Sequence, residues 1–200
     1  MSEVVLITTV LLDLDGVVRH FDTEYVSRIE AAAGLADGAI LAAAFETDLL
    51  HSVITGRITR ADWTLEVGRR INNAGAAQDW LAAPAVVDDE VMLVVDQLRD
   101  CGVTVAVLTN GTDTIPAEMI ELGLADRFDA IFSTSDIGFA KPDRRAFEYA
   151  CDRLDVHPAR VFFTDDSESK LSGALEIGMQ ANHFVGVETF KVQLRDFGLL

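Results

Sequence analysis

The sequence predicts an α/β protein whose parallel sheet is covered by helices on both faces, with a small all-helical insertion after the first strand. An apolar run over residues 4–12 ends in two aspartates, which is typical of a buried strand that reaches a polar loop. Residues 21–84 show helical spacing without a convincing strand, and beyond them short apolar runs alternate with helical patterns. This alternation is typical of a Rossmann-like parallel sheet. We therefore expect an α/β core from residues 1–20 and 85–200, interrupted by helices over residues 21–84.

The first strand is expected over Val4–Leu12, and a turn or short hairpin follows it over Val17–Phe21. The insertion contains several amphipathic helices. In one of them Thr59 is the expected capping residue, and the apolar side consists of Trp63, Val67 and Ile71.

The second part of the chain alternates helices and strands. A helix is expected over Val87–Leu98, ending before Gly102. Further strands are expected over Val103–Leu108, Ala130–Ser133 and Val161–Thr164, and within Gln180–Val185. Helices are expected up to Leu122, along the stripe Phe147–Leu154, which includes Cys151, and over residues 167–177. Because ligands bind at the carboxyl ends of the strands in such sheets, the polar residues at those ends are the candidates for a functional site.

The charge of the chain restricts its partners. Asp and Glu number 33 against 16 Lys and Arg, which gives a formal net charge of −17. An acidic surface repels phosphate backbones and anionic lipids, so we expect no nucleic-acid and no membrane partner. No apolar run approaches the roughly 20 residues that a membrane helix needs, and the N-terminal residues lack a basic leader. These features favour a cytoplasmic protein, and they leave its oligomeric state open.

The predicted strand ends carry a distinctive set of polar residues. In chain order, the set consists of Asp13 and Asp15, Thr109-Asn110-Gly111, the loop residue Lys141, and Asp165-Asp166. Carboxylates at the end of a buried strand need compensating positive charge, from a metal ion, a lysine or both. Oxygen ligands of this kind suit Mg²⁺, and no histidine or cysteine cluster favours zinc.

These residues resemble the four motifs of the haloacid dehalogenase (HAD) superfamily of hydrolases. The motifs occur in the family's order as Asp13-Leu14-Asp15-Gly16-Val17, Leu108-Thr109-Asn110-Gly111, Lys141-Pro142 and Phe162-Phe163-Thr164-Asp165-Asp166. The helical insertion falls where one class of the family carries its cap, and Thr55–Thr59 resembles a recurring part of that cap. The double Asp of the fourth motif is similar to the branch that includes sugar-phosphate phosphatases and the phosphatase domain of soluble epoxide hydrolases.

The resemblance implies a role for each matching residue. Asp13 is the expected nucleophile, and Asp15 the acid that protonates the leaving alcohol and then accepts a proton from water. Thr109, the amide at Asn110, and Lys141 are expected to bind the phosphoryl group. Mg²⁺ is the expected cofactor. Its expected ligands are the side chains of Asp13 and Asp166 and the backbone carbonyl of Asp15.

Several residues leave alternatives open. Asp165 is either a helix cap together with Glu168 or an acid that supports the site. Lys170 occupies a position where the family usually has Asn or Asp. On a continuous helix it would face Asp166, where it either pairs with an acid of the site or turns to solvent. Arg19 and His20 are equally compatible with a solvated linker and with substrate recognition. Among the remaining polar or aromatic residues of the cap, we expect surface or cap-core roles for His51, Arg57 and Trp63.

The predicted function is Mg²⁺-dependent hydrolysis of a small phosphomonoester, for example a sugar phosphate, through an aspartyl-phosphate. One alternative is a 2-haloacid dehalogenase, although Asp15 argues against it because a halide leaving group needs no acid. A second alternative is a catalytically weak relative that serves in binding or regulation, for which Lys170 is the motive.

Overall fold

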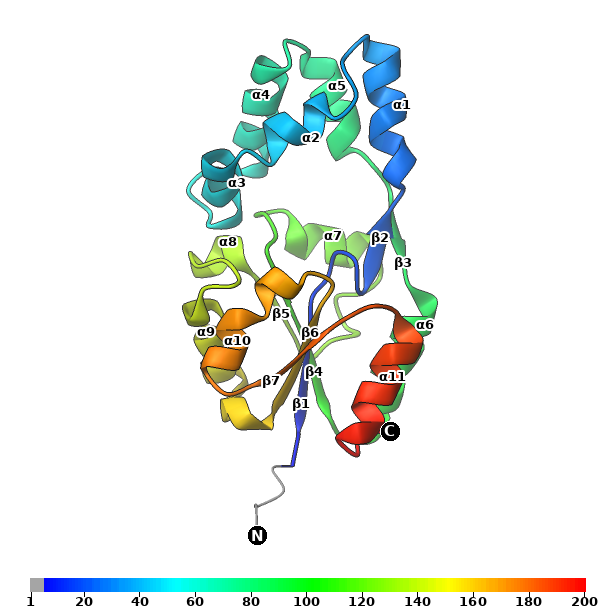
Figure 1. The fold of residues 1–200 in the computed structure, drawn as a ribbon, viewed down its shortest axis with the longest axis vertical. Coiled ribbons are helices and arrows are strands. Elements are labelled where there is room, and N and C mark those ends of the chain that lie inside the picture. The colour runs from blue at the N-terminus through cyan, green and yellow to red at the C-terminus, as the bar shows by residue number, and fades with distance from the viewer. Residues whose placement is uncertain (1–5) are drawn as a thin grey trace.

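The computed structural model describes residues 6–200 and contains a lower α/β part and an upper helical part (Figure 1). The lower part is built on a five-stranded parallel sheet with the order β5-β4-β1-β6-β7. Its strands are β1 (Thr9–Leu12), β4 (Thr104–Thr109), β5 (Ala130–Ser133), β6 (Val161–Asp165) and β7 (Gln180–His183). The predicted α/β fold is therefore confirmed.

Helices cover both faces of this sheet, which explains why its central strands are apolar on both sides. Val10 and Leu12 of β1 pack into the same cluster as α6 (Asp89–Asp100), α7 (Ile115–Glu121) and α11 (Val187–Asp196). Leu11 points to the opposite face, toward α9 (Arg144–Leu154) and α10 (Ser172–Glu176). Since successive side chains of a strand alternate between faces, both sets become buried.

The helical part, at the top of Figure 1, has a hydrophobic cluster of its own that its helices enclose. Its helices are α1 (Thr23–Ala33), α2 (Ala39–Ala44), α3 (Thr47–Ile54), α4 (Arg60–Arg70) and α5 (Ala74–Leu81). Trp63 and Trp80 meet edge to face at its centre, with their ring centroids 5.2 Å apart. The expected cap of α4 is confirmed, because Thr59 and Asp62 form a reciprocal capping box. We refer to this part as the cap and to the α/β part as the core. The division at residues 20/21 and 84/85 stays a prediction.

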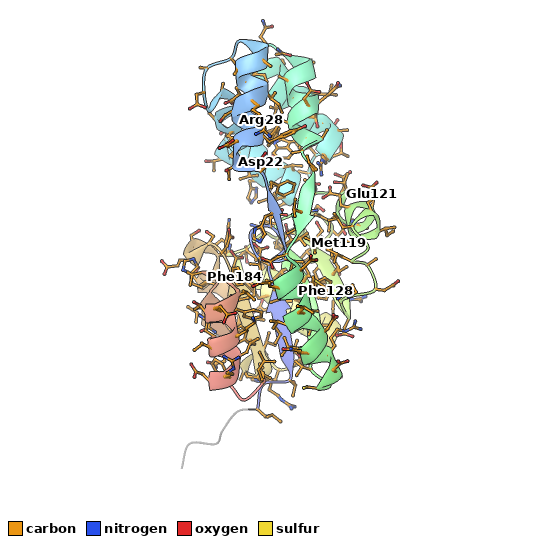
Figure 2. The ribbon with its side chains drawn as sticks, turned by 90° about the vertical axis from the view of Figure 1, so that its right-hand side faces the viewer. Asp22, Arg28, Met119, Glu121, Phe128 and Phe184 are labelled. Carbon is orange, nitrogen blue, oxygen red and sulfur yellow. The ribbon has the colours of Figure 1, made fainter. Side chains whose placement is uncertain are left out.

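A two-stranded antiparallel ribbon runs between the two parts. It pairs β2 (Arg19–Phe21) with β3 (Ala85–Val87), and in Figure 2 both strands rise from the core toward the cap. Asp22 and Arg28 form an ion pair at the foot of α1, directly above the ribbon, whereas Met119 and Phe128 are buried below it.

The structure corrects several expected elements. Val87 belongs to β3 rather than to the following helix, which begins at Asp89. The helix expected over 167–177 consists of a 3₁₀ turn, Glu168–Lys170, followed by α10. The first strand is assigned from Thr9, and residues 4 and 5 of the expected strand lie outside the described residues. The short helix α8 (Thr134–Ile137) and the terminal helix α11 are additions to the predicted order.

Two further expectations can be compared with the structure. Cys151 is buried, as expected of a small apolar residue, while Cys101 is exposed at the end of α6. Between residues 6 and 200, every helix is too short or too polar to span a bilayer.

Candidate active site

Asp13, Lys141 and Asp165 form a buried cluster at the carboxyl end of the sheet. The Lys141 ammonium donates hydrogen bonds to Asp13 Oδ1 at 2.8 Å and to Asp165 Oδ2 at 2.6 Å. The side chains of Lys141 and Asp165 are 1% and 0% exposed, and that of Asp13 is 12% exposed. The lysine therefore supplies the positive charge that two carboxylates at buried strand ends require.

The register of the sheet brings the two acids to the same level. Leu12 lies opposite Thr164, and the Asp13 N–H donates to the Thr164 carbonyl at 2.9 Å, so Asp13 and Asp165 follow side by side. Asp165 Oδ1 accepts a hydrogen bond from the Ser167 N–H at 2.9 Å. Of its two expected roles, the capping box with Glu168 is wrong, because its carboxylate holds Lys141 and the loop instead.

Asn110 holds the backbone of Lys141 in place. Its side chain donates to the Lys141 carbonyl at 3.0 Å and accepts from the Lys141 N–H at 2.8 Å. Gly173 lets α10 approach the same loop, since a Cβ there would overlap the carbonyl of Pro142. The Asn110 side chain is thus engaged with protein, which leaves only its backbone amide for the expected contact with a phosphoryl group.

The site carries more negative charge than Lys141 neutralises. Burial raises the pKa of Asp13 to about 6, even though the Lys141 ammonium acts in the opposite direction. Burial and the Asp165 carboxylate also raise the pKa of Asp166. Burial alone would lower the pKa of Lys141, but the carboxylates of Asp13 and Asp165 raise it above its ordinary value. An additional cation would therefore be bound favourably here.

The donor atoms present fit a hard divalent cation. Asp13, Asp165 and Asp166 can each contribute one carboxylate oxygen, and these oxygens lie within 4.8 Å of one another. Gly16 makes room for this arrangement: its φ is +91°, and a Cβ there would overlap the Asp166 carboxylate. Asp15 is not in this group of carboxylates, because its side chain pairs with Arg19.

Asp15 is the end of a chain of ion pairs that extends into the cap. Arg19 Nε donates to Asp15 Oδ1 at 2.5 Å, and Arg19 Nη1 donates to Glu118 Oε2 at 2.7 Å. The other oxygen of Glu118 accepts a hydrogen bond from Arg60, the first residue of α4. We call Asp15, Arg19, Glu118 and Arg60 the ion-pair chain. It joins the first strand end, the ribbon, α7 and the cap.

Arg60 makes further contacts that fix the cap on the core. Its backbone N–H donates to Asp113 at 2.7 Å, and its guanidinium donates to the hydroxyl of Thr114 at 3.0 Å. Although burial raises the pKa of Glu118, the hydrogen bond from Thr114 and the charges of Arg19 and Arg60 lower it overall. Glu118 is consequently a carboxylate at neutral pH.

The other expected residues lie around this centre. Thr109 is buried at the end of β4, two residues after Val107, which lies opposite Leu12 of β1. His20 pairs with Asp88 at 3.1 Å, at the ribbon, so it belongs to the linker. Of the two alternatives for Lys170, pairing with a site acid is contradicted, because within residues 6–200 its ammonium is not within 4.0 Å of any carboxylate. The 3₁₀ turn replaces the helix on which that expectation depended.

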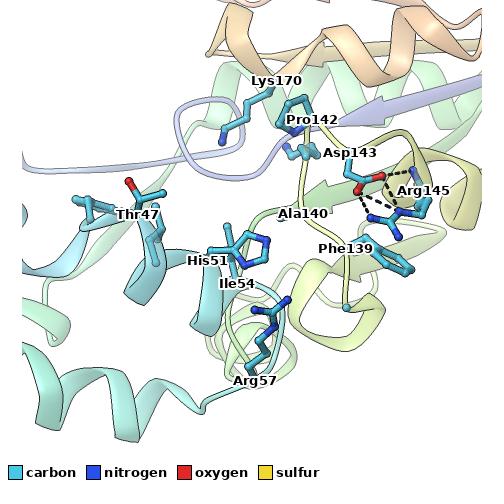
Figure 3. A pocket seen from close by; sticks show the side chains of 14 residues that line it. Thr47, His51, Ile54, Arg57, Phe139, Ala140, Pro142, Asp143, Arg145 and Lys170 are labelled. Carbon is cyan, nitrogen blue, oxygen red and sulfur yellow. Dashed lines mark hydrogen bonds and ion pairs between the residues drawn. The ribbon is translucent and has the colours of Figure 1, made fainter.

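Lys170 instead lines a cavity of about 570 Å³ between cap and core. The cap contributes α3 and the loop that carries Arg57, and the core contributes residues 138–145 (Figure 3). Lys141 lies in the lining and its ammonium also bonds to Asp13, so this one residue connects the wall of the cavity with the buried cluster. His51 and Arg57 are exposed, as expected of surface residues, and both line the cavity, whereas Trp63 is buried in the cap as expected.

The comparison with protein families identifies the chain. A family model for haloacid dehalogenase-like hydrolases matches residues 7–178. The chain belongs to this family. It is therefore an enzyme of the hydrolase class, and the resemblance seen in its four motifs is confirmed.

The proteins to which this chain is similar have more than one activity. Phosphatase MT3486 of Mycobacterium tuberculosis is 28% identical over 190 residues, which cover 88% of this chain and 86% of that protein. (S)-2-Haloacid dehalogenase 4A of Burkholderia cepacia is 36% identical over 84 residues, which cover 42% of this chain and only 36% of the dehalogenase.

A solved structure supports the fold over most of the chain. It is that of a HAD family enzyme from Bacteroides thetaiotaomicron in complex with magnesium and inorganic phosphate. The two chains superpose with a TM-score of 0.73 at 21% identity, over 88% of this chain and 93% of the other. At this level of identity the likeness concerns the fold alone.

Three features of the site were missed from the sequence. They are the Asn110 clamp on Lys141, the pairing of Arg19 with Asp15, and the docking of Arg60 on Glu118. Only the second has a local signal, because Arg19 follows Asp15 by four residues. The other two join residues 31 and 58 positions apart in the sequence.

Proposed function

We propose that the protein is a Mg²⁺-dependent phosphatase that hydrolyses a small phosphomonoester through an aspartyl-phosphate. The observation that carries the proposal is the arrangement of two acids with different surroundings. Asp13 is nearly buried against Lys141, whereas Asp15 is half-exposed and held by Arg19. A buried nucleophile beside an accessible acid is what transfer to an aspartate and protonation of an alcohol require.

Asp13 and Asp166, with the backbone carbonyl of Asp15, are the residues proposed to hold Mg²⁺. Asp165 lies close enough to join them, but both of its carboxylate oxygens already accept hydrogen bonds, from Lys141 and from the Ser167 N–H. When bound, the cation would offset the repulsion between a carboxylate nucleophile and a phosphate dianion.

Each residue of the proposed site has a separate role in the hydrolysis. Asp13 attacks phosphorus while the bond to the ester oxygen breaks, and Asp15 gives its proton to that oxygen. A water molecule then loses a proton to Asp15 and attacks the phosphorus, which releases inorganic phosphate and restores the Asp13 carboxylate. Lys141, Thr109 and the backbone amide of Asn110 are the groups proposed to bind the phosphoryl oxygens.

Dehalogenation is the second candidate, because the sequence identity to the Burkholderia dehalogenase, within its shorter alignment, is higher than the identity to the Mycobacterium phosphatase. A halide leaves without a proton, so the pair of Asp15 and Arg19 would have no part in that reaction. The longer alignment with the Mycobacterium phosphatase also supports phosphate chemistry.

The test is turnover of p-nitrophenyl phosphate with Mg²⁺ and with EDTA, beside chloride release from 2-chloropropionate. We expect Mg²⁺-dependent phosphate release that Asp13→Asn reduces at least about 1,000-fold, and no chloride release. Chloride release without phosphatase activity would establish the second candidate. Absence of both activities over a broad panel of phosphate esters would contradict the proposal.

A further inference from the structure

The cavity between cap and core has a charge opposite to that of the whole chain. The chain contains twice as many acidic as basic residues and only three lysines. Two of those lysines line the cavity, together with Arg57 and Arg145, and Asp143 is the one acid in its lining. Since the field of the whole protein repels anions, this local excess of positive charge needs a reason of its own.

Two of the four basic groups are already neutralised by protein carboxylates. Lys141 is bonded to Asp13 and Asp165, and Arg145 pairs with Asp143 at 2.5 Å. Figure 3 shows the second pair joined at one side of the cavity. These two residues therefore do not account for any attraction toward an additional anion.

Arg57 and Lys170 are the other two basic residues of the lining. Throughout residues 6–200, neither side chain has a carboxylate within 4.0 Å. One comes from the cap and the other from the core, and Figure 3 shows His51 and Ile54 of α3 between them. A ligand in the cavity would meet a cation on each side.

The position of Arg57 is fixed by the neighbouring backbone. Gly56 has a φ of +70°, and a Cβ there would overlap the Ser135 carbonyl of α8. The loop that carries Arg57 therefore lies directly against the core. A side chain carried on a loop packed in this way can bind an anion without the loop having to become ordered first.

Part of the cavity wall is apolar. Phe45 from the cap is 52% exposed and Phe139 from the core is 36% exposed, and both belong to the lining together with Leu50 and Ile54. A volume of about 570 Å³ lies within the range of cavities that enclose small ligands. A ligand with an apolar or aromatic body would cover these side chains.

We propose that the cavity binds the leaving group of the substrate, and that Arg57 and Lys170 bind a second anionic group on it. The substrate class is then a phosphomonoester with an apolar or aromatic body and a carboxylate or a further phosphate. The inference rests on the proposed phosphatase function, because Lys141 connects the cavity to Asp13.

The experiment compares three aryl phosphates with the full chain and Mg²⁺. They are phenyl phosphate, 4-carboxyphenyl phosphate and 1,4-phenylene bisphosphate, which have no second anion, a carboxylate and a phosphate. We expect kcat/KM to be at least about tenfold higher for one or both of the substrates with a second anionic group than for phenyl phosphate. This factor corresponds to one charge-assisted hydrogen bond. The preferred one of the two identifies the anion.

Variants connect that selectivity to the two residues. In Arg57→Gln and Lys170→Gln the ratio of kcat/KM between the doubly anionic substrate and phenyl phosphate is expected to fall about fivefold each. Arg28→Gln and Lys191→Gln remove the same charges from α1 and α11, outside the cavity, and should leave the ratio unchanged. An equal fall in the control variants would show a general charge effect and overturn the inference.

Binding measurements separate this inference from the proposed function. The probes are phenylphosphonate and 4-carboxyphenylphosphonate, which are not hydrolysed, and the readout is Kd by calorimetry. Tighter binding of the carboxylated probe, dependent on Arg57 and Lys170, in an enzyme without turnover would support the cavity and contradict the phosphatase. Turnover with equal constants for all substrates and probes would overturn the cavity and leave the phosphatase. Failure of both turnover and binding would overturn both.

Discussion

Cap and core meet in two places that use the same residue types in opposite ways. In the ion-pair chain, Arg60 and Arg19 share the carboxylate of Glu118, and Arg19 also holds Asp15. At the cavity, Arg57 and Lys170 line the same volume from the cap and from the core, and neither has a carboxylate partner within residues 6–200. Satisfied charges fix the parts of an enzyme relative to one another, whereas unsatisfied charges at a cavity are available to a ligand. The following predictions test this difference.

The largest effect is expected at Lys141, which lines the cavity and bonds to Asp13 in the reaction centre. Lys141→Met leaves the buried carboxylates of Asp13 and Asp165 without their cation. We expect a loss of about 3–5 kcal/mol in the free energy of unfolding and no detectable phosphatase activity. Urea unfolding with and without Mg²⁺ measures the first quantity. Lys191→Met, which removes a surface lysine on α11, serves as the control, and an equal loss there would contradict the assignment.

Glu118→Gln breaks the ion-pair chain at its centre. Arg19 is 5% exposed and loses one of its two carboxylates, so we expect a loss of about 2 kcal/mol in the free energy of unfolding. The expected fall in kcat is about tenfold, because the orientation of Asp15 depends on Arg19. Glu121→Gln changes an exposed residue of the same helix (Figure 2) and should have no effect on kcat. Equal kcat values in the two variants would show that the chain does not position Asp15.

The stabilisation by Glu118 is expected to depend on pH. Its pKa is lowered in the folded protein, so its contribution is complete above the ordinary glutamate pKa of about 4.3. The contribution is lost as pH falls below that value and through the folded pKa. The difference in unfolding free energy between wild type and Glu118→Gln should therefore shrink at acid pH. A difference that stays constant from pH 6 to pH 3 would exclude this origin.

Arg60→Gln and Arg57→Gln are neighbouring changes with opposite expected signatures. Arg60→Gln should cost about 1 kcal/mol, because the pair is partly exposed, and lower kcat for every substrate. Arg57→Gln should change little in stability and act on the selectivity for doubly anionic substrates. Thermal unfolding and steady-state kinetics distinguish the two. Arg69→Gln, whose ion pair stays within α4, is the control for both.

The smallest expected effect on catalysis is that of Gly56→Ala in the loop beside Arg57. A Cβ there overlaps the Ser135 carbonyl, so the loop must move away from the core and Arg57 with it. We expect a loss of more than about 1 kcal/mol in stability, since the overlap adds to the backbone strain, and a higher KM for doubly anionic substrates. Gly34→Ala has a similar φ of +67° but open space around the added Cβ, so it reports the backbone strain alone. The same KM in both variants would contradict the role of this contact.

The order of strands and helices could largely be predicted from the sequence, because each depends on a periodicity within about ten residues. The exceptions have a common cause. β3 has only three residues, and it is stabilised by pairing with β2, from which the whole cap separates it in the sequence. The break at Leu171 separates a 3₁₀ turn from α10 in a segment whose composition favours one helix. In both cases tertiary contacts decide the local conformation.

The same distinction applies to the site. The sequence by itself determined that Asp13, Thr109 and Asp165 end neighbouring strands at one edge of the sheet, because parallel strands end at that edge and the strands were recognisable. The loop residue Lys141 was added to them by the resemblance of the motifs. Only the tertiary structure decided which cations are paired. Arg60 lies 58 residues from Glu118, and Lys170 lies four residues from the acid it was expected to meet. Pairing depends on where side chains converge in space, and that is why Arg19 and Arg60 have carboxylate partners while Arg57 and Lys170 have none within residues 6–200.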